Sequence, residues 1–291
     1  MTQRAVRMGG GAGLVGIVTE PEAPLDRPMV LLLNAGMLHR VGPNRLHVRL
    51  ADRLASLGFR VLRFDFSGIG DSPTSDTSAS FVDRSMDEAR IVMDFASCKY
   101  EANRFVSIGL CSGADVSYGL ARDDDRVAGA VLINGGFAEA DMTAQRLAEA
   151  QERIQARFYK GRMFDKGSWK RLLTLQSDMG AVGRTLKRAL RKPLEKTAEP
   201  STPRPPAELA RLQTRGVQLL RIYSEGSFTW DLLQLLYGAN GEALEPFPRH
   251  RVEFLPHVDH VFTPLWAQEQ LVDLVGRWAT ELDAAQSDRI G

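Results

Sequence analysis

Apolar runs alternate with amphipathic segments along the first half of the chain. Pro28–Asn34 is apolar almost throughout, which is typical of a strand buried on both faces. Further strands are expected at Gly13–Thr19, Arg60–Asp65, Arg104–Leu110 and Val127–Asn134, with helices at Asn44–Leu57, Val82–Cys98 and Ser112–Leu120. In the first helix Asn44 is the expected N-cap and Gly58 ends the helix. Strands that alternate with helices predict a parallel sheet covered on both faces.

The alternation stops after Gly136. Phe137–Pro206 contains no strand-like run, is helical in composition and ends in a proline-rich stretch. The alternation then resumes, with strands expected at Val217–Tyr223 and Arg251–Leu255 and helices at Asp231–Tyr237 and Pro264–Leu282. We therefore expect one α/β core, residues 1–136 and 207–291, that is interrupted by a helical cap at 137–206.

Composition narrows the class of protein. Hydrophobic residues make up 44% and charged residues 25% of the 291 positions, which excludes wholesale disorder. No apolar run approaches the ~20 residues of a membrane span, and the first residues lack a signal-peptide pattern. Two cysteines form no disulfide framework, so a cytoplasmic location is expected. The net charge of +1 predicts no binding to nucleic acid.

The segment Gly109-Leu110-Cys111-Ser112-Gly113 stands where a strand meets a helix. A sharp strand-to-helix turn needs small residues two places before and after its tip, and the tip side chain is then exposed. This is the pattern of a nucleophile elbow with Cys111 at the tip. A helix N-terminus and a nearby histidine would favour the reactive thiolate. The alternative is a buried structural cysteine that precedes a helix.

His260 is the expected general base, because it follows the last strand and precedes the final helix, as the base does in this architecture. His257 is the competing candidate. The acid is expected after the Val217–Tyr223 strand. Ser227 stands where an aspartate would be expected, which leaves Asp231 as the first choice and Glu225 as the second. A Cys–His dyad without an acid is the third alternative, since a thiol depends less on a strong base than an alcohol does.

The turn Asn34-Ala35-Gly36-Met37 should complete an oxyanion hole. Gly36 permits the tight turn, and the backbone N–H groups of Met37 and Ser112 are the expected donors. His39, in the same loop, is a candidate substrate contact or an ordinary exposed residue. The glycines of Asp65–Ser72 are interpreted as a structural turn, because no lysine follows them as a phosphate-binding loop requires. No metal or cofactor is expected.

These motifs in this order resemble an α/β-hydrolase, in particular the α/β-hydrolases found with bacterial exosortase and exopolysaccharide systems. The segments that carry the resemblance are LNAGMLHRVGPNRLHVRLADRLASLGFRVLRFDFSGIGDS, GLCSGA and DHVF. The resemblance implies an eight-stranded, mostly parallel sheet and a nucleophile–His–acid site under a helical cap. It transfers the elbow to Cys111, the base to His260 and the oxyanion turn to Gly36 and Met37, but it transfers no acid, because Ser227 replaces the usual aspartate.

The expected activity is acyl transfer from an ester or thioester through an acyl-enzyme, with a thioesterase or acyltransferase favoured over a carboxylesterase. A catalytically impaired binding protein of the same fold is the alternative from another class. Phe137–Pro206 has 15 Lys and Arg against 8 Asp and Glu, a net charge of +7. This excess fits a carrier-protein-linked or CoA-linked substrate, or peripheral contact of the cap with anionic lipid, and it also fits an ordinary solvated helical face.

Overall fold

The structure is a computed structural model that describes residues 1–11, 13–75, 79–137, 207–225 and 227–287. The chain divides into two compact units, Met1–Asp141 with Pro205–Gly291 and Met142–Arg204. The first unit contains all of the described residues. The expected helical cap at 137–206 lies outside the described residues apart from Phe137, so it stays a prediction.

One eight-stranded sheet forms the core of the first unit, in the order β1-β2-β4-β3-β5-β6-β7-β8. β1 and β2 are antiparallel to their neighbours, and the strands from β4 to β8 run parallel. The strands are β1 Thr2–Met8, β2 Leu14–Glu20, β3 Met29–Leu33, β4 Val61–Phe64, β5 Phe105–Leu110, β6 Val127–Ile133, β7 Gln218–Ser224 and β8 His250–Leu255. The expected mostly parallel α/β sheet is confirmed.

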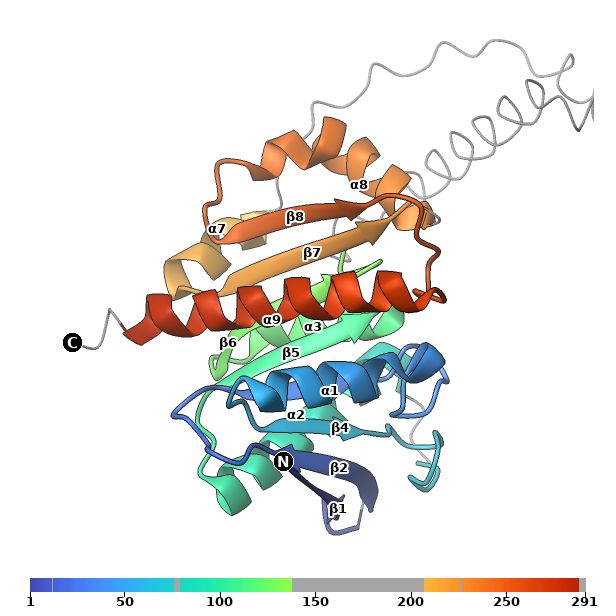
Figure 1. Cartoon of the computed structure of the whole chain (residues 1–291), viewed down its shortest axis with the longest axis vertical. Helices are drawn as coiled ribbons and strands as arrows, with labels where there is room; N and C mark the ends of the chain where they lie inside the picture. The colour runs from blue at the N-terminus through green and yellow to red at the C-terminus, as the bar shows by residue number, and fades with distance from the viewer. Residues whose placement is uncertain (12, 76–78, 138–206, 226, 288–291) are drawn as a thin grey trace, which may run out of the picture. The chain divides into compact units, whose positions relative to one another are not determined.

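Helices cover both faces of this sheet (Figure 1). α1 and α9 contact each other on one face, and α2 and α3 contact each other on the other. The α-helices are α1 Leu46–Ser56, α2 Phe81–Tyr100, α3 Ser112–Asp123, α7 Ala207–Arg215, α8 Phe228–Tyr237 and α9 Leu265–Ser287. The 3₁₀ turns are η1 Pro43–Arg45 and η3 Ala239–Leu244. Because both faces are covered, β3, β4 and β5 are buried along their whole length, as their apolar runs predict.

The start of the chain and the start of α1 differ from the sequence prediction. β1 was not expected, because its exposed edge carries polar residues that dilute the strand pattern. Asn44 is not an N-cap: it has a positive φ of 48°, and α1 begins two residues later at Leu46. The buried ring of His47 packs closely against Gly42 before this helix, because a Cβ on Gly42 would lie 2.6 Å from His47 Cγ.

His47 should make folding stability depend on pH. Burial lowers the pKa of His47 to about 4, from an ordinary value of 6.5. Between pH 6.5 and 4, His47 is therefore protonated in the unfolded chain but neutral in the folded chain. Its contribution to the free energy of unfolding is fully present above pH 6.5 and is lost as the pH falls toward 4. We expect the loss to be about 3 kcal/mol. Urea unfolding at pH 7 and pH 4 should show a smaller difference in His47→Leu than in wild type, and equal differences would contradict the assignment.

The order of the strands places the candidate site. β3 lies between β4 and β5 in the sheet. The chain passes from β3 to β4 on one side of it and then continues to β5 and β6 on the other side, so the order of the strands reverses at β3. Ligands of open α/β sheets bind at such a switch point, beyond the carboxyl ends of the strands. The turn at Asn34–Met37 and the elbow at Cys111 follow β3 and β5 and therefore lie at this edge.

Candidate active site

Cys111 occupies the tip of a strained turn between β5 and α3. Its φ of 57° and ψ of −123° are values that a side-chain-bearing residue rarely adopts. Its N–H donates to Ile133 O at 2.9 Å, and its carbonyl accepts from Ala114 N–H. The residue is exposed rather than buried in the core. The geometry agrees with a nucleophile elbow and disfavours a buried structural cysteine.

Two glycines allow this turn. A Cβ on Gly109 would lie 2.0 Å from Gly113 O, and a Cβ on Gly113 would lie 2.5 Å from Asn34 O. Each contact involves backbone atoms, which cannot rotate away as a side chain can. The close approach of β5, α3 and the end of β3 therefore requires glycine at both positions.

His260 lies in the loop between β8 and α9, and its backbone is tied to the elbow region through Asn134. Asn134 follows β6, and its side-chain amide donates to His260 O at 2.9 Å and to Ser224 Oγ at 3.0 Å. The preceding residue, Ile133, accepts the N–H of Cys111. The residues Ile133 and Asn134 thus contact both the elbow and the histidine loop. Sequence analysis gave Asn134 no role, and only its place directly after a strand hinted at one.

The imidazole of His260 has a hydroxyl partner. Its Nδ1 lies 3.1 Å from Ser227 Oγ, and Ser227 is almost fully buried. Burial lowers the pKa of His260, and the neighbouring Asp259 carboxylate partly opposes this shift. The neutral imidazole, which is the form that can accept a proton, therefore persists below the usual histidine range.

The two carboxylates considered as the acid take different places. Glu225 Oε2 accepts the backbone N–H of His257 at 2.7 Å and lies 3.2 Å from His257 Nδ1. Glu225 is therefore paired with the histidine that sequence analysis ranked second. Asp231 lies in the first turn of α8, one helical turn beyond Ser227. The role of Asp231 stays a prediction, whereas the contact at His260 Nδ1 belongs to Ser227.

The turn after β3 has the expected shape. Gly36 has a φ of +57°, and its N–H donates to Ser112 Oγ at 2.8 Å, which binds this turn to the elbow. Gly36 thus contributes the turn, because its own N–H is already used. In the described part of the chain, the N–H of Met37 meets no hydrogen-bond acceptor. Met37 and Ser112 remain the proposed oxyanion donors.

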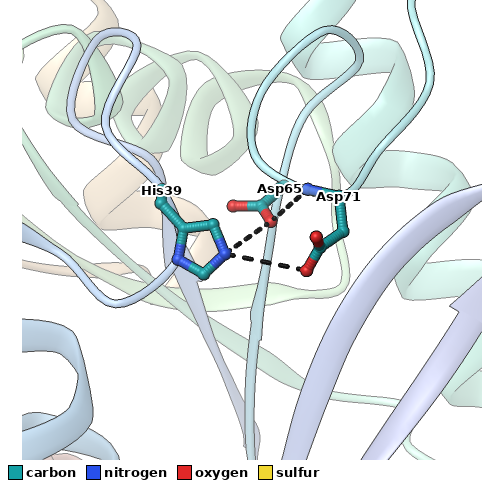
Figure 2. Close-up of side chains that lie close together, drawn as sticks. All are labelled: His39, Asp65 and Asp71. Atoms are coloured by element: carbon teal, nitrogen blue, oxygen red, sulfur yellow. Dashed lines mark hydrogen bonds and ion pairs between the residues drawn. The ribbon is translucent and has the colours of Figure 1, made fainter.

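His39 belongs to a charged cluster beside this turn, with Asp65 and Asp71 (Figure 2). Its Nε2 lies 3.5 Å from Asp65 Oδ2 and 3.8 Å from Asp71 Oδ2. Three ligand atoms at this spacing could hold a metal ion. However, the Arg40 guanidinium binds both carboxylates, and it approaches Asp71 Oδ2 to 2.6 Å. Because Arg40 already pairs with both carboxylates, the fit of the cluster to a metal ion is poor.

A comparison with protein families identifies the chain. A family model described as serine aminopeptidase, S33, matches residues 36–188, just over half of the 291 residues. The chain belongs to this family. The matched stretch includes the Gly36 turn and the elbow, and the chain is an α/β-hydrolase. Its elbow residue is Cys111, although the family description names a serine enzyme.

Solved structures share the fold of this α/β-hydrolase at low sequence identity. An esterase from Pyrococcus furiosus aligns with a TM-score of 0.59 at 14% identity, covering 97% of this chain and 91% of its own. A dienelactone hydrolase from Anabaena variabilis aligns with a TM-score of 0.57 at 13% identity, covering 96% and 97%. A proline iminopeptidase from Mycobacterium smegmatis aligns with a TM-score of 0.53 at 17% identity, covering 98% and 100%. No curated protein sequence matches the chain.

The helices of this α/β-hydrolase can be compared with the length and apolar character that a membrane span requires. Over the described ranges, which exclude residues 138–206, no helix has both the length and the apolar character needed to cross a bilayer.

Proposed function

We propose that this α/β-hydrolase cleaves a thioester or ester by forming an acyl-enzyme on Cys111. The observation that carries the proposal is the strained elbow. It holds an exposed thiol at the N-terminus of α3, beside a segment that also anchors His260.

The reaction proceeds in two halves. His260 Nε2 takes the thiol proton, and Cys111 Sγ attacks the acyl carbonyl carbon. The resulting oxyanion accepts hydrogen bonds from the N–H groups of Met37 and Ser112. As the tetrahedral intermediate collapses, the leaving thiolate or alkoxide takes the proton from His260. Water then loses a proton to His260 and attacks the acyl-enzyme, and the acid is released as Cys111 regains its proton.

A thiol nucleophile favours thioesters among the acyl substrates. The attacking and leaving sulfur atoms have similar basicity, so the intermediate can collapse forward without a strong acid. An oxygen ester needs more help from the acid, since an alkoxide is a poorer leaving group. The esterases among the structural relatives keep a carboxylesterase as the next candidate.

An apolar rim at the carboxyl edge of the sheet supports an acyl chain of appreciable length. Five large apolar side chains in the described part of the chain are exposed there, in loops and helix starts that follow β3, β7 and β8. The members of this apolar rim are Met37, Leu38, Phe228, Leu265 and Trp266. Exposed apolar groups gathered at one edge are typical of a binding surface rather than of ordinary solvent-facing residues.

The basic composition of Phe137–Pro206 supports an anionic partner on the substrate side. We propose that the acyl group is presented on a phosphopantetheine-type carrier or CoA, whose phosphates would complement this charge. Peripheral contact of this segment with anionic lipid is the alternative for the same charge.

A second function has one specific observation in its favour. His260 meets the neutral Ser227 where a catalytic carboxylate would be expected. Such a site suits a binding protein that has lost turnover, and the absence of turnover with every acyl donor would favour that function.

The thioester proposal is tested with acyl thioesters and p-nitrophenyl esters of matched, graded chain length. We expect kcat/KM to favour thioesters by about 10-fold. It should rise up to about fourfold for each CH₂ that reaches the apolar rim. Cys111→Ser should abolish the thioester preference, and Cys98→Ser, an exposed thiol on α2, is the matched control. A thioester preference that survives in Cys111→Ser, or an oxygen-ester preference in wild type, would overturn the proposal.

A further inference from the structure

The buried hydroxyl group of Ser227 contacts the Nδ1 side of the His260 ring, and the half-buried hydroxyl of Thr229 contacts Ser227 in turn. Ser227 Oγ lies 3.1 Å from His260 Nδ1 and 2.6 Å from Thr229 Oγ1. The backbone N–H of Thr229 also donates to Ser227 Oγ at 3.3 Å. Ser227 is the N-cap of α8 and is only 3% exposed, so the helix start fixes the position of this hydroxyl.

We infer that Ser227 is the positioning residue of His260, that it takes the place of a catalytic carboxylate, and that it thereby restricts the site to a thiol nucleophile. This inference rests on the proposed function, in which Cys111 attacks the acyl carbon and His260 moves the proton. It assigns to Ser227 a role that the N-cap alone does not require.

Hydrogen-bond accounting is compatible with the direction of the contacts that the proposed mechanism requires. A serine hydroxyl has one proton and two lone pairs, and the Thr229 N–H occupies one lone pair. When Ser227 donates its proton to Thr229 Oγ1, its second lone pair accepts from Nδ1–H of His260. Nε2 is then left unprotonated and can accept the thiol proton. The same arrangement holds when His260 becomes an imidazolium, because Nδ1 keeps its proton throughout.

The chemical consequence depends on the nucleophile. An ordinary thiol has a pKa of about 8.5, within reach of an imidazole, so its proton moves without help from a second charge. An alcohol is far less acidic and needs a base strengthened by an adjacent carboxylate. When a serine enzyme loses the function of that carboxylate, kcat falls about 10⁴-fold. A neutral hydroxyl at Nδ1 therefore suits Cys111 and would not support serine in its place.

The ionisable groups on the adjoining segments do not replace this contact in the described structure. Asp259 Oδ1 accepts the N–H of Thr263 at 2.8 Å, and Glu225 is paired with His257. Asp231 lies farther along α8 and is the remaining carboxylate candidate. The experiment therefore compares Ser227 directly with Asp231 and Glu225.

The first measurement is the pH profile of kcat/KM with an acyl thioester. Ser227→Ala should lower kcat about 10-fold or more with little change in KM, and Ser227→Thr, which keeps the hydroxyl, should recover most of this loss. Ser227→Asp should move the acid limb upward by about one pH unit or more, because a carboxylate favours the imidazolium. Asp231→Asn and Glu225→Gln should stay within about threefold of wild type. Ser56→Ala, at the end of α1, is the matched control.

The second measurement combines the positioning residue with the nucleophile. Cys111→Ser alone should lose activity by about 10³-fold or more. Adding Ser227→Asp to Cys111→Ser should restore at least about 10-fold, whereas Ser227→Asp with Cys111 intact should give no increase in kcat. A cooperative thermal unfolding transition above the assay temperature shows that the variants are folded, and the pH profile reports on His260 independently of the stability lost with the N-cap.

Three results would overturn the inference. The first is a Ser227→Ala enzyme with the rate and the pH profile of wild type. The second is a loss in Asp231→Asn as large as that in Ser227→Ala, which would assign the role to that carboxylate. The third is no gain from Ser227→Asp in the Cys111→Ser background. Failure of the proposed function has a different signature, since activity would then persist in Cys111→Ala whatever residue stands at position 227.

Discussion

Replacing Cys111 with alanine is expected to reduce kcat about 10³-fold or more and to remove the label that a thiol-directed acylating or alkylating probe places at position 111, while Cys98 stays labelled. The reason is that the elbow exposes a single sulfur atom at the N-terminus of α3. No acyl-enzyme can form without that atom. The measurement is steady-state turnover of an acyl thioester together with mass spectrometry of the labelled protein.

Two further variants, His260→Ala and Cys98→Ala, test the proposed base and the second exposed thiol. His260→Ala should lose activity to a similar extent, because nucleophile and base act as one unit and their losses are not additive. Cys98→Ala should remove a second labelled site while leaving turnover unchanged, since Cys98 lies on α2. Equal labelling of wild type and Cys111→Ala under conditions where Cys98 is blocked would rule out Cys111 as the nucleophile.

Gly109→Ala is expected to destabilise the fold by about 3 kcal/mol or more and to remove activity with it. The added Cβ would lie 2.0 Å from Gly113 O and 2.6 Å from Ala114 N, so β5 and the first turn of α3 would have to separate. That movement would also displace Cys111, because it lies between the two glycines. Urea unfolding followed by circular dichroism measures the loss of stability.

Gly11→Ala is the matched control for this substitution. A Cβ on Gly11 would meet no atom within 4 Å, so the same chemical change should leave both stability and activity near wild type. Gly36→Ala is an intermediate case, because its Cβ would touch only Ser112 Oγ at 4.0 Å but its φ is +57°. A Gly109→Ala protein as stable as Gly11→Ala would contradict the packing argument for the elbow.

Much of the fold followed from hydrophobic patterning. Strands buried on both faces carry mostly apolar residues, so Met29–Leu33 and Phe105–Leu110 were predictable within a residue or two. The exposed edge strand β1 escaped prediction, because polar residues on an edge look like a loop in sequence. The expected N-cap at Asn44 failed for a different reason. Asn44 and Arg45 both have positive φ values in the 3₁₀ turn before α1, so the helix begins only at Leu46.

The features of the candidate site likewise divide into those set by neighbouring residues and those set by long-range packing. The glycines at 109 and 113 reveal the elbow in the sequence because a steric requirement acts over neighbouring residues. The turn with Gly36 is local in the same sense, and its positive φ requires no distant information. Each of these features was therefore open to prediction from the residues alone.

The hydrogen-bond partner of His260 Nδ1 could be identified only from the tertiary structure. Ser227 and His260 stand 33 positions apart, and three oxygen-bearing residues, Glu225, Ser227 and Asp231, compete for the contact within one short segment. Which of them meets the ring depends on where α8 begins and how it packs, and both are consequences of long-range burial. Local sequence determined that a thiol stands at the tip of the turn at position 111, whereas the three-dimensional fold decided which side chain contacts the imidazole of His260, because that contact joins segments that only folding brings together.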